Sequence, residues 1–352
     1  MVQQLKMMSY YDHIDELKQI DSIVDLKLTS AISDAGIHTM QIAHRVKTAD
    51  SVIGKLQRKP EKYSSATSMT DLVGFRIICY FTEQIDKISA IIEELFDVDK
   101  DNCIDKSKTL SPNAFGYLSV HYICSLKKSD DYPESLCKFK FEIQIRTVLQ
   151  HTWAEIEHDL GYKNEFGVPI HVRREFSRMA SLLEVADEGF GRIKKELDEY
   201  SAIVIDKLQK GDVANVAIDT LSLREFMKYN TDYLALVKDI SSITGATISE
   251  ANADPFIKQL MFFRIADLGR LDAAIKSNRN LTLAIARDSL EGMEIDELSS
   301  FVGLYYLCRA LLISGPYSES DINLFFSLMS TKSSMVGQNA SRVLKLREKY
   351  MN

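Results

Sequence analysis

The sequence predicts an α+β domain followed by an all-helical domain. Up to about residue 205, short strand-like segments rich in β-branched and aromatic residues alternate with segments of helical periodicity. Beyond that point, every apolar pattern has the period of a helix. Between the two, the polar stretch Gln209–Asn215 contains a glycine and is typical of a linker. We therefore expect domains at residues 1–205 and 206–352.

The first elements are predicted from residue spacing and composition. Residues 14–60 carry apolar residues at helical spacing and are expected to form helices, which end at Pro60 and the Ser/Thr-rich stretch 64–70. Val73–Phe81 is rich in β-branched and aromatic residues and is short enough for a buried strand. Helical spacing resumes over Gln84–Leu95.

Two further strands are predicted from the alternation of their side chains. Tyr117–Tyr122 alternates between two faces, and Lys138–Arg146 alternates more cleanly, with only apolar residues on one face. The other face of the second strand carries four polar side chains: Lys140, Glu142, Gln144 and Arg146. This polar face is therefore expected to lie against solvent or a groove and not against the core.

Helical periodicity returns after the last strand. Leu149–Leu160 has an apolar stripe that consists of Leu149, Trp153, Ile156 and Leu160. Beyond the linker, helical spacing predicts a series of helices: Leu223–Ile240, Pro255–Leu268, Leu271–Ser277, Glu297–Leu312 and Asp321–Met329.

Composition excludes several classes of protein. A hydrophobic fraction of 45% with 26% charged residues is typical of globular proteins. No apolar run approaches the ~18 residues of a membrane helix, and the N-terminus lacks a secretory signal, so we expect a cytoplasmic protein without a membrane partner. The five cysteines form no C-x-x-C pair, which argues against disulfides and structural zinc. A net charge of −7 argues against indiscriminate nucleic-acid binding.

Charged residues suggest where chemistry could occur. Asp71 and Glu142 belong to neighbouring strand regions, and two carboxylates could hold Mg²⁺ beside nucleotide phosphates. Asp71 lies five positions before Arg76, so it must sit at the strand entry or follow a bulge. A basic block lies upstream and forms either a solvated helix face or an anion site: Arg45, Lys47, Lys55, Arg58, Lys59 and Lys62.

Five strings in register resemble the RelA/SpoT synthetase family. They cover roughly residues 35–200 and comprise Arg45-Val-Lys47 with Ser51, Lys55 and Arg58-Lys59, then Asp71-Leu-Val-Gly-Phe-Arg76, Gly116-Tyr-Leu-Ser-Val-His121, Glu142-Ile-Gln-Ile-Arg-Thr147, and Trp153-Ala-Glu-Ile-Glu-His158 with Gly161-Tyr-Lys163. The resemblance implies a DNA polymerase β-like nucleotidyltransferase fold, a mixed sheet with flanking helices. It implies transfer of the β,γ-pyrophosphate of ATP to the 3′-hydroxyl of GTP or GDP, giving (p)ppGpp.

The same resemblance implies roles for individual residues. Asp71 and Glu142 would be catalytic and hold Mg²⁺, with Glu142 also accepting the proton of the attacking hydroxyl. Residues implied for ATP binding are Arg45, Lys47, Ser51, Lys55 and Arg76, of which the two arginines would flank the adenine. Residues implied for acceptor binding are Tyr117, which would stack on guanine, His121, Gln144 and Arg146. Glu157, His158 and Lys163 are expected to support the site.

The acceptor pocket departs from the family pattern. Asn113, Phe115 and Leu118 stand where relatives often have a basic residue, Asn, and Arg or Gln. These changes remove charge and polarity, so the alternative acceptor is the 3′ CCA end of tRNA, as in the toxin branch of the family. A second alternative is an inactive nucleotide-binding module.

The rest of the chain adds two expectations. The chain has no H-D-x-x-E-D string, so we expect a synthetase without a hydrolase half. The helical C-terminal domain would have a regulatory, oligomerisation or restraining role, with a second copy or another protein as its partner.

Overall fold

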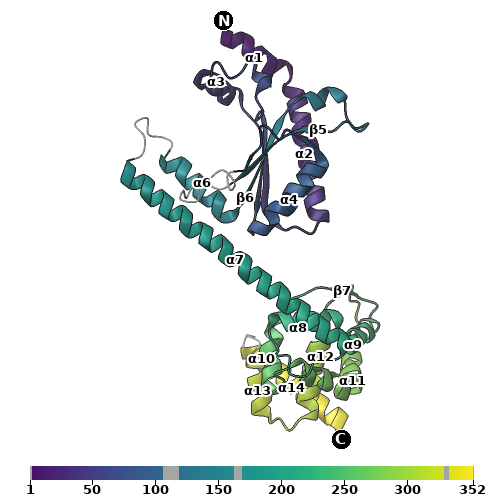
Figure 1. The fold of residues 1–352 in the computed structure, drawn as a ribbon. Helices are drawn as coiled ribbons and strands as arrows, with labels where there is room; N and C mark the ends of the chain where they lie inside the picture. Colours follow the sequence, from purple (N-terminus) through teal and green to yellow (C-terminus); the bar gives the residue numbers. More distant parts are fainter. Residues whose placement is uncertain (1, 106–118, 162–168, 329–332, 352) are drawn as a thin grey trace. The chain divides into compact units, whose positions relative to one another are not determined.

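The computed structural model describes residues 2–105, 119–161, 169–328 and 333–351 (Figure 1). The chain forms two compact units, Met1–Lys194 and Lys195–Asn352. The boundary between them falls within one uninterrupted helix, α7 (Ile170–Lys210). Within the described ranges, no helix is both long and apolar enough to cross a membrane.

The N-terminal unit is built on a mixed sheet. Its strands, in spatial order, are β1 (Thr39–Val46), β2 (Val73–Cys79), β6 (Phe141–Thr147), β5 (Val120–Leu126) and β3 (Phe96–Val98), with β4 (Ile104–Asp105) also paired to β5. β2 and β6 run parallel, whereas the other pairs are antiparallel. The predicted mixed sheet with flanking helices is thus confirmed.

Helices cover both faces of this sheet (Figure 1). The helices before and around it are α1 (Val2–Asp12), α2 (Ile14–Asp34), α3 (Ala49–Arg58), α4 (Thr82–Leu95) and α6 (Val148–Gly161). α2 and α4 pack on one face, and α6 contacts β6 and β2 from the other. The core lies under α2 and α4, where Leu17, Val24 and Ile88 bury against Phe141 and Ile143.

The sequence prediction was wrong about β1. Residues 39–46 were expected to be helical because Ile42 and Val46 are four residues apart. A spacing of four also places two residues on one face of a strand, so the two periods cannot be distinguished over so short a segment. Among the described strands, β1 pairs with β2 alone, and its side chains are partly or fully exposed, so it shows little alternation of buried and exposed residues.

Other boundaries also shift. β6 begins at Phe141 instead of Lys138 because a 3₁₀ turn, Glu134–Lys138, occupies the preceding residues. β5 begins at Val120, and residues 117 and 118 lie outside the described residues. The stripe predicted for α6 is only partly buried: Trp153 is buried, but the side chains of Ile156 and Leu160 are exposed.

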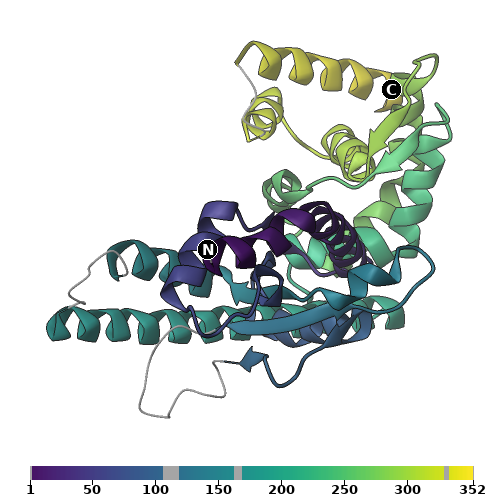
Figure 2. The same ribbon diagram turned by 90° about the horizontal axis from the view of Figure 1, so that it is seen from above.

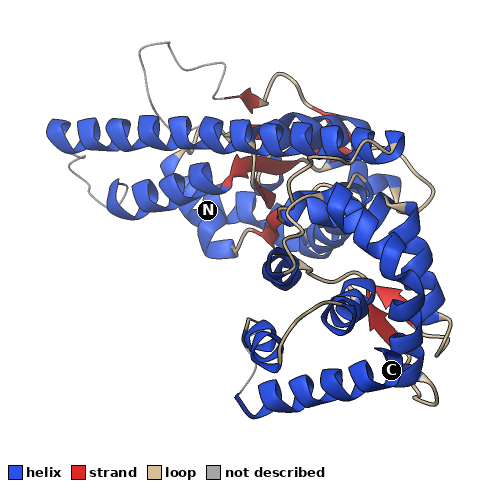
Figure 3. Ribbon diagram, turned by 90° about the horizontal axis from the view of Figure 1, so that it is seen from below, coloured by secondary structure: helices blue, strands red, loops and turns tan. Residues whose placement is uncertain are grey.

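The C-terminal unit is mainly helical (green to yellow in Figure 2). Its helices after α7 are α8 (Thr220–Tyr229), α9 (Thr231–Ser241), α10 (Asp254–Phe262), α11 (Leu268–Leu290), α12 (Val302–Ser314), α13 (Glu319–Ser327) and α14 (Ser333–Met351). Residues of α11 and α12, among them Ile275, Leu304 and Leu307, are fully buried in a core of their own. The expectation of helices alone was incomplete, because β7 (Thr247–Ser249) and β8 (Glu297–Ser299) form a parallel pair, drawn as red strands in Figure 3.

Candidate active site

Strand register brings the polar side chains of the sheet together on one face. Gly74 of β2 lies opposite Glu142 of β6 and Arg45 of β1, so these three positions share a face. One pair further along, Gln144 lies between Arg76 on β2 and His121 on β5. The predicted alternation of β6 is confirmed, since Phe141, Ile143 and Ile145 are fully buried on the other face.

Asp71 is held by two lysines. Oδ2 of Asp71 accepts hydrogen bonds from Nζ of Lys47 at 2.5 Å and Nζ of Lys55 at 2.6 Å. Lys47 directly follows β1, and its backbone N–H donates to Leu72 O, which ties the end of β1 to the start of β2. Asp71 therefore sits at the strand entry, which is one of the two placements that its spacing from Arg76 allowed.

Burial and the neighbouring charges shift the pKa values of Asp71, Lys47 and Lys55 in opposite directions. Burial raises the pKa of Asp71, but the hydrogen bonds and charges of Lys47 and Lys55 outweigh it, so the pKa of Asp71 lies below its usual value. Burial lowers the pKa of Lys47, and Asp71 does not fully compensate. Burial also acts to lower the pKa of Lys55, but Asp71 reverses the effect and the net shift is upward. We take the carboxylate to be ionised, because two ammonium groups contact a single oxygen.

Glu142 belongs to a chain of side-chain hydrogen bonds. Nδ1 of His121 donates to Oε1 of Glu142 at 2.8 Å, and Nε2 of Gln144 donates to Oε2 at 2.9 Å. Nη2 of Arg146 in turn donates to Oε1 of Gln144 at 2.9 Å. Burial raises the pKa of Glu142, but the hydrogen bond and charge of His121 outweigh it and the net shift is downward. Burial, together with the charge of Arg76, lowers the pKa of Arg146 to about 10, so the arginine stays charged at neutral pH.

These side chains surround a cavity of about 260 Å³. The charged and amide side chains that line it are Arg45, Lys47, Asp71, Arg76, Glu142 and Gln144. Arg76 is oriented by α6, because its Nη1 donates to Oε1 of Glu155 at 2.9 Å. The cavity thus combines two carboxylates with three cations on or next to the strands, an arrangement suited to a polyanion and a divalent cation.

The donor set fits a magnesium ion. Oδ1 of Asp71 is buried and has no hydrogen-bond partner among the described residues, and Nε2 of His121 is in the same situation. Asp71 and Glu142 line the same cavity, and the negative charge of Asp71 acts to raise the pKa of Glu142. A bound cation would reduce this repulsion between the two carboxylates. Carboxylate oxygens are the ligands that Mg²⁺ prefers in proteins.

Most of the residues singled out from sequence come together here, and some do not. Ser51 is exposed on α3, where its backbone N–H donates to the N-cap Thr48, and it does not line the cavity. Glu157 and His158 are exposed on α6 and do not line the cavity either. Tyr117 and Lys163, like Asn113, Phe115 and Leu118, lie outside the described residues.

Sequence reasoning missed two contacts that shape the site. Glu155, the partner of Arg76, lies within the Trp153–His158 string, but nothing in helical periodicity distinguishes it from Glu157. Asp187 of α7 accepts a hydrogen bond from Thr147 at the end of β6. Asp187 is one of several acids in α7, and nothing in the sequence distinguishes it from Glu184 or Glu188.

A mixed sheet whose polar face joins two carboxylates to several cations is typical of enzymes that act on phosphate compounds. A family model described as "Region found in RelA / SpoT proteins" matches residues 44–166. GTP pyrophosphokinase YwaC of Bacillus subtilis (strain 168) is 32% identical over 161 residues, which cover 44% of this chain and 73% of the relative. The chain belongs to the RelA/SpoT family, and it is an enzyme of the ATP-dependent pyrophosphotransferase class.

Similarity to further proteins was also found. GTP pyrophosphokinase YjbM of Bacillus subtilis (strain 168) is 29% identical over 163 residues, which cover 46% of this chain and 74% of the relative. Solved structures with similarity include small alarmone synthetase 1 of Bacillus subtilis, at 26% identity and a TM-score of 0.45 over 54% of this chain and 98% of that chain. Small alarmone synthetase 2 of the same organism matches at 27% identity and a TM-score of 0.46, over 53% and 99% of the two chains.

Proposed function

We propose that this enzyme transfers the β,γ-pyrophosphate of ATP to the 3′-hydroxyl of GTP or GDP and thus makes (p)ppGpp. The observation that carries the proposal is the cavity in which Asp71 and Glu142 face a group of cations from β1 and β2 and the residue after β1. The names of the two Bacillus relatives, both GTP pyrophosphokinases, support the same acceptor. The proposal includes a fold of the DNA polymerase β-like nucleotidyltransferase type.

In the proposed reaction, the acceptor 3′-oxygen forms a bond to the β-phosphorus of ATP, the bond from that phosphorus to the α-phosphate oxygen breaks, and AMP leaves. The hydroxyl proton passes to Glu142, which is ionised because His121 and Gln144 lower its pKa. A weak base is sufficient, since phosphoryl transfer depends mainly on positioning and charge neutralisation. Asp71 and Glu142 would hold Mg²⁺, which neutralises phosphate charge when bound.

The remaining residues would position the two nucleotides. Lys47 and Lys55 would contact ATP phosphates, and Arg45 and Arg76 would flank the adenine, since guanidinium planes stack on purines. Ser51 would join the ATP contacts. Residues proposed for the acceptor are Tyr117, His121, Gln144 and Arg146, and those proposed as supports are Glu157, His158 and Lys163.

A transfer assay tests this proposal. Purified protein is incubated with Mg²⁺, γ-labelled ATP and GDP, GTP or tRNA, and we expect label on the guanosine nucleotides. Glu142→Gln should abolish the transfer, whereas Glu83→Gln, on the exposed surface of α4, should not alter it. Full activity of Glu142→Gln would refute its role, and absence of transfer to all three acceptors would favour an inactive binding module.

The tRNA acceptor is the second candidate, favoured by Asn113, Phe115 and Leu118, which remove polarity near the proposed guanine site. A terminal adenosine needs no pocket for 5′-phosphates. In this case the C-terminal unit would restrain the enzyme. Label on tRNA alone, and growth arrest by residues 1–209 but not by the full chain, would establish this candidate over (p)ppGpp synthesis.

A further inference from the structure

The C-terminal unit contains a small polar cavity far along the sequence from the synthetase site. Its volume is about 180 Å³, and it lies between the end of α11, α12 and α14. The polar side chains that line it are Ser289, Tyr305, Tyr306, Arg309, Asn339 and Arg342. All of these groups can donate hydrogen bonds, and the lining contains no carboxylate.

Arg309 is a buried cation without an acidic partner. Its side chain is 9% exposed, and its guanidinium carbon lies 3.3 Å from the ring centroid of Tyr305. Nη1 donates to the backbone O of Tyr305 at 3.0 Å, which leaves most of its five N–H groups without an acceptor of opposite charge. Among the residues that the structure describes, no carboxylate pairs with it. Burying an arginine in this way is costly unless a counter-charge is supplied.

A second arginine adds positive charge to the same cavity. Arg342 is exposed on α14, lines the cavity, and forms no ion pair within the described parts of the chain. Burial is the main cause that lowers the pKa of Arg309, and the neighbouring Tyr305, Cys308 and Tyr306 act against it. The positive charge of Arg342 makes a smaller contribution in the same direction as burial. Two positive charges at one cavity repel each other, and an anion bound between them would be attracted to both.

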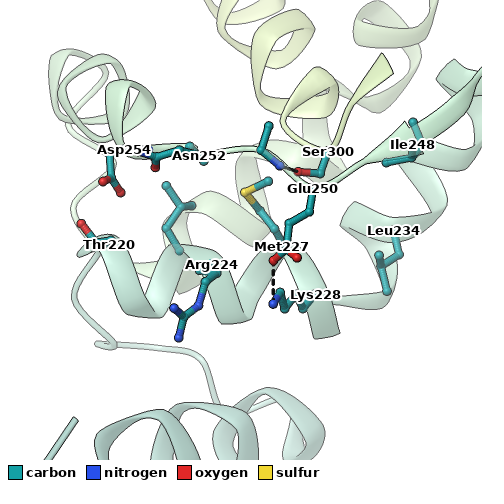
Figure 4. A pocket seen from close by; sticks show the side chains of 13 residues that line it. Thr220, Arg224, Met227, Lys228, Leu234, Ile248, Glu250, Asn252, Asp254 and Ser300 are labelled. Carbon is teal, nitrogen blue, oxygen red and sulfur yellow. Dashed lines mark hydrogen bonds and ion pairs between the residues drawn. The ribbon is translucent and has the colours of Figure 1, made fainter. Parts of the chain in front are cut away.

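Several other cations of this unit are paired with carboxylates. Arg279 contacts Asp239 at 2.5 Å, and Arg270 contacts Asp267 at 3.1 Å. In the larger pocket of about 690 Å³ beside α8, Lys228 bonds Glu250 at 2.7 Å across the opening (Figure 4). The described part of the unit also holds cations without a carboxylate partner, such as the exposed Lys238. Arg309 differs from them because it is buried and lines a cavity together with a second arginine.

We propose that the Arg309 cavity binds a small tetrahedral oxyanion, either free phosphate or the phosphoryl group of a small metabolite. The guanidinium forks of Arg309 and Arg342 match phosphate oxygens geometrically, and Asn339 and Ser289 add neutral donors. Since a water molecule takes about 30 Å³, a cavity of about 180 Å³ holds such an ion with a few waters.

The test measures the thermal stability of the full chain with and without ligand, at constant ionic strength. Because a ligand that binds only the folded state raises its stability, inorganic phosphate should raise the melting temperature of the protein. Arg342→Gln should weaken phosphate binding, measured by titration calorimetry, by about 10-fold or more. Lys345→Gln removes an exposed charge from the same helix outside the cavity and should bind phosphate as the unaltered protein does.

The design separates this cavity from the synthetase site, because Arg342→Gln leaves Lys47 and Lys55 in place. Arg342 is exposed, so its replacement should not disturb folding, and Arg309→Met provides a second, buried variant. Ribose 5-phosphate is the second probe: binding of phosphate alone assigns the site to the free ion, and binding of both assigns it to phosphomonoesters. Equal responses of the unaltered protein, Arg342→Gln and Lys345→Gln to both probes would overturn the proposal.

Discussion

The hydroxyl of Thr147 donates a hydrogen bond to Oδ2 of Asp187 at 2.5 Å, and this bond joins the end of β6 to α7. Both residues are buried. Thr147 is five residues after Glu142 on the same strand, so the bond fixes the C-terminal end of the strand that carries the proposed catalytic carboxylate.

Asp187 makes stability depend on pH. Burial raises its pKa above the ordinary 3.8, and the bond from Thr147 only partly offsets this. Because the folded-state pKa is the higher one, the ionised carboxyl destabilises the fold at neutral pH, and this penalty is lost as pH falls through the raised pKa towards 3.8. Asp187→Asn keeps an acceptor for Thr147 without the charge, so it should raise the free energy of unfolding at pH 7 but not near pH 4.

Urea unfolding at both pH values measures this effect. Asp187→Ala is the matched variant, and it should destabilise by about 1–3 kcal/mol because the Thr147 hydroxyl is left buried without a partner. Equal pH dependence of the unaltered protein and Asp187→Asn would contradict the assigned titration.

His121 is predicted to position Glu142. It donates to Oε1 of Glu142, so His121→Ala frees the carboxylate to rotate away from the cavity. Loss of such an orienting partner typically costs about 10–100-fold in activity or metal affinity. We expect that fall in kcat together with a higher Mg²⁺ requirement, measured in the transfer assay.

The control is His171→Ala, which alters an exposed histidine at the start of α7. A His121→Ala enzyme with unchanged kcat and Mg²⁺ dependence would show that Gln144 alone orients Glu142.

The polar face of β6 was predictable from sequence, and the contacts that complete the site were not. Strict alternation of Phe141, Ile143 and Ile145 identifies the buried face because the period of a strand is fixed by its backbone. The pairing of Asp71 with Lys47 depends on β1, which local periodicity assigned to a helix. β1 forms through hydrogen bonds to a strand thirty or so residues away, and no local pattern encodes such a partner.

Glu155 is predicted to hold Arg76 in the orientation that ATP binding requires. Its carboxylate accepts from Nη1 of Arg76 at 2.9 Å, but both side chains are partly exposed, so the bond contributes modestly to stability. Glu155→Gln should therefore raise the KM for ATP several-fold and leave kcat nearly unchanged. Steady-state kinetics with varied ATP measures the two constants separately.

Glu157→Gln, two residues further along α6, is the control and should leave the KM for ATP unchanged. If Glu157→Gln raised the KM for ATP more than Glu155→Gln, Glu157 would be the residue that supports the ATP site, and the orientation of Arg76 would not depend on Glu155.

Gly303 is predicted to be required for packing in the C-terminal unit. A Cβ at this position of α12 would lie 2.8 Å from the ring of Tyr233 and 3.2 Å from Val237 of α9. Tyr233 cannot move aside, because its ring is buried and its hydroxyl donates to Ser300 O at 2.7 Å. Gly303→Ala should therefore destabilise the unit by about 1–3 kcal/mol through overpacking.

Gly337→Ala is the matched control for Gly303. Gly337 is also in a helix, α14, and a Cβ there would meet no atom within 4 Å. Since alanine favours a helix over glycine by about 0.5–1 kcal/mol, this variant should be stabilised. Both variants gain the same helix propensity and differ in the space around the added methyl group. We therefore expect Gly303→Ala to lower the melting temperature and Gly337→Ala to raise it. Shifts of the same sign would mean that α9 and α12 adjust to the added methyl group and that the packing at Tyr233 is not rigid.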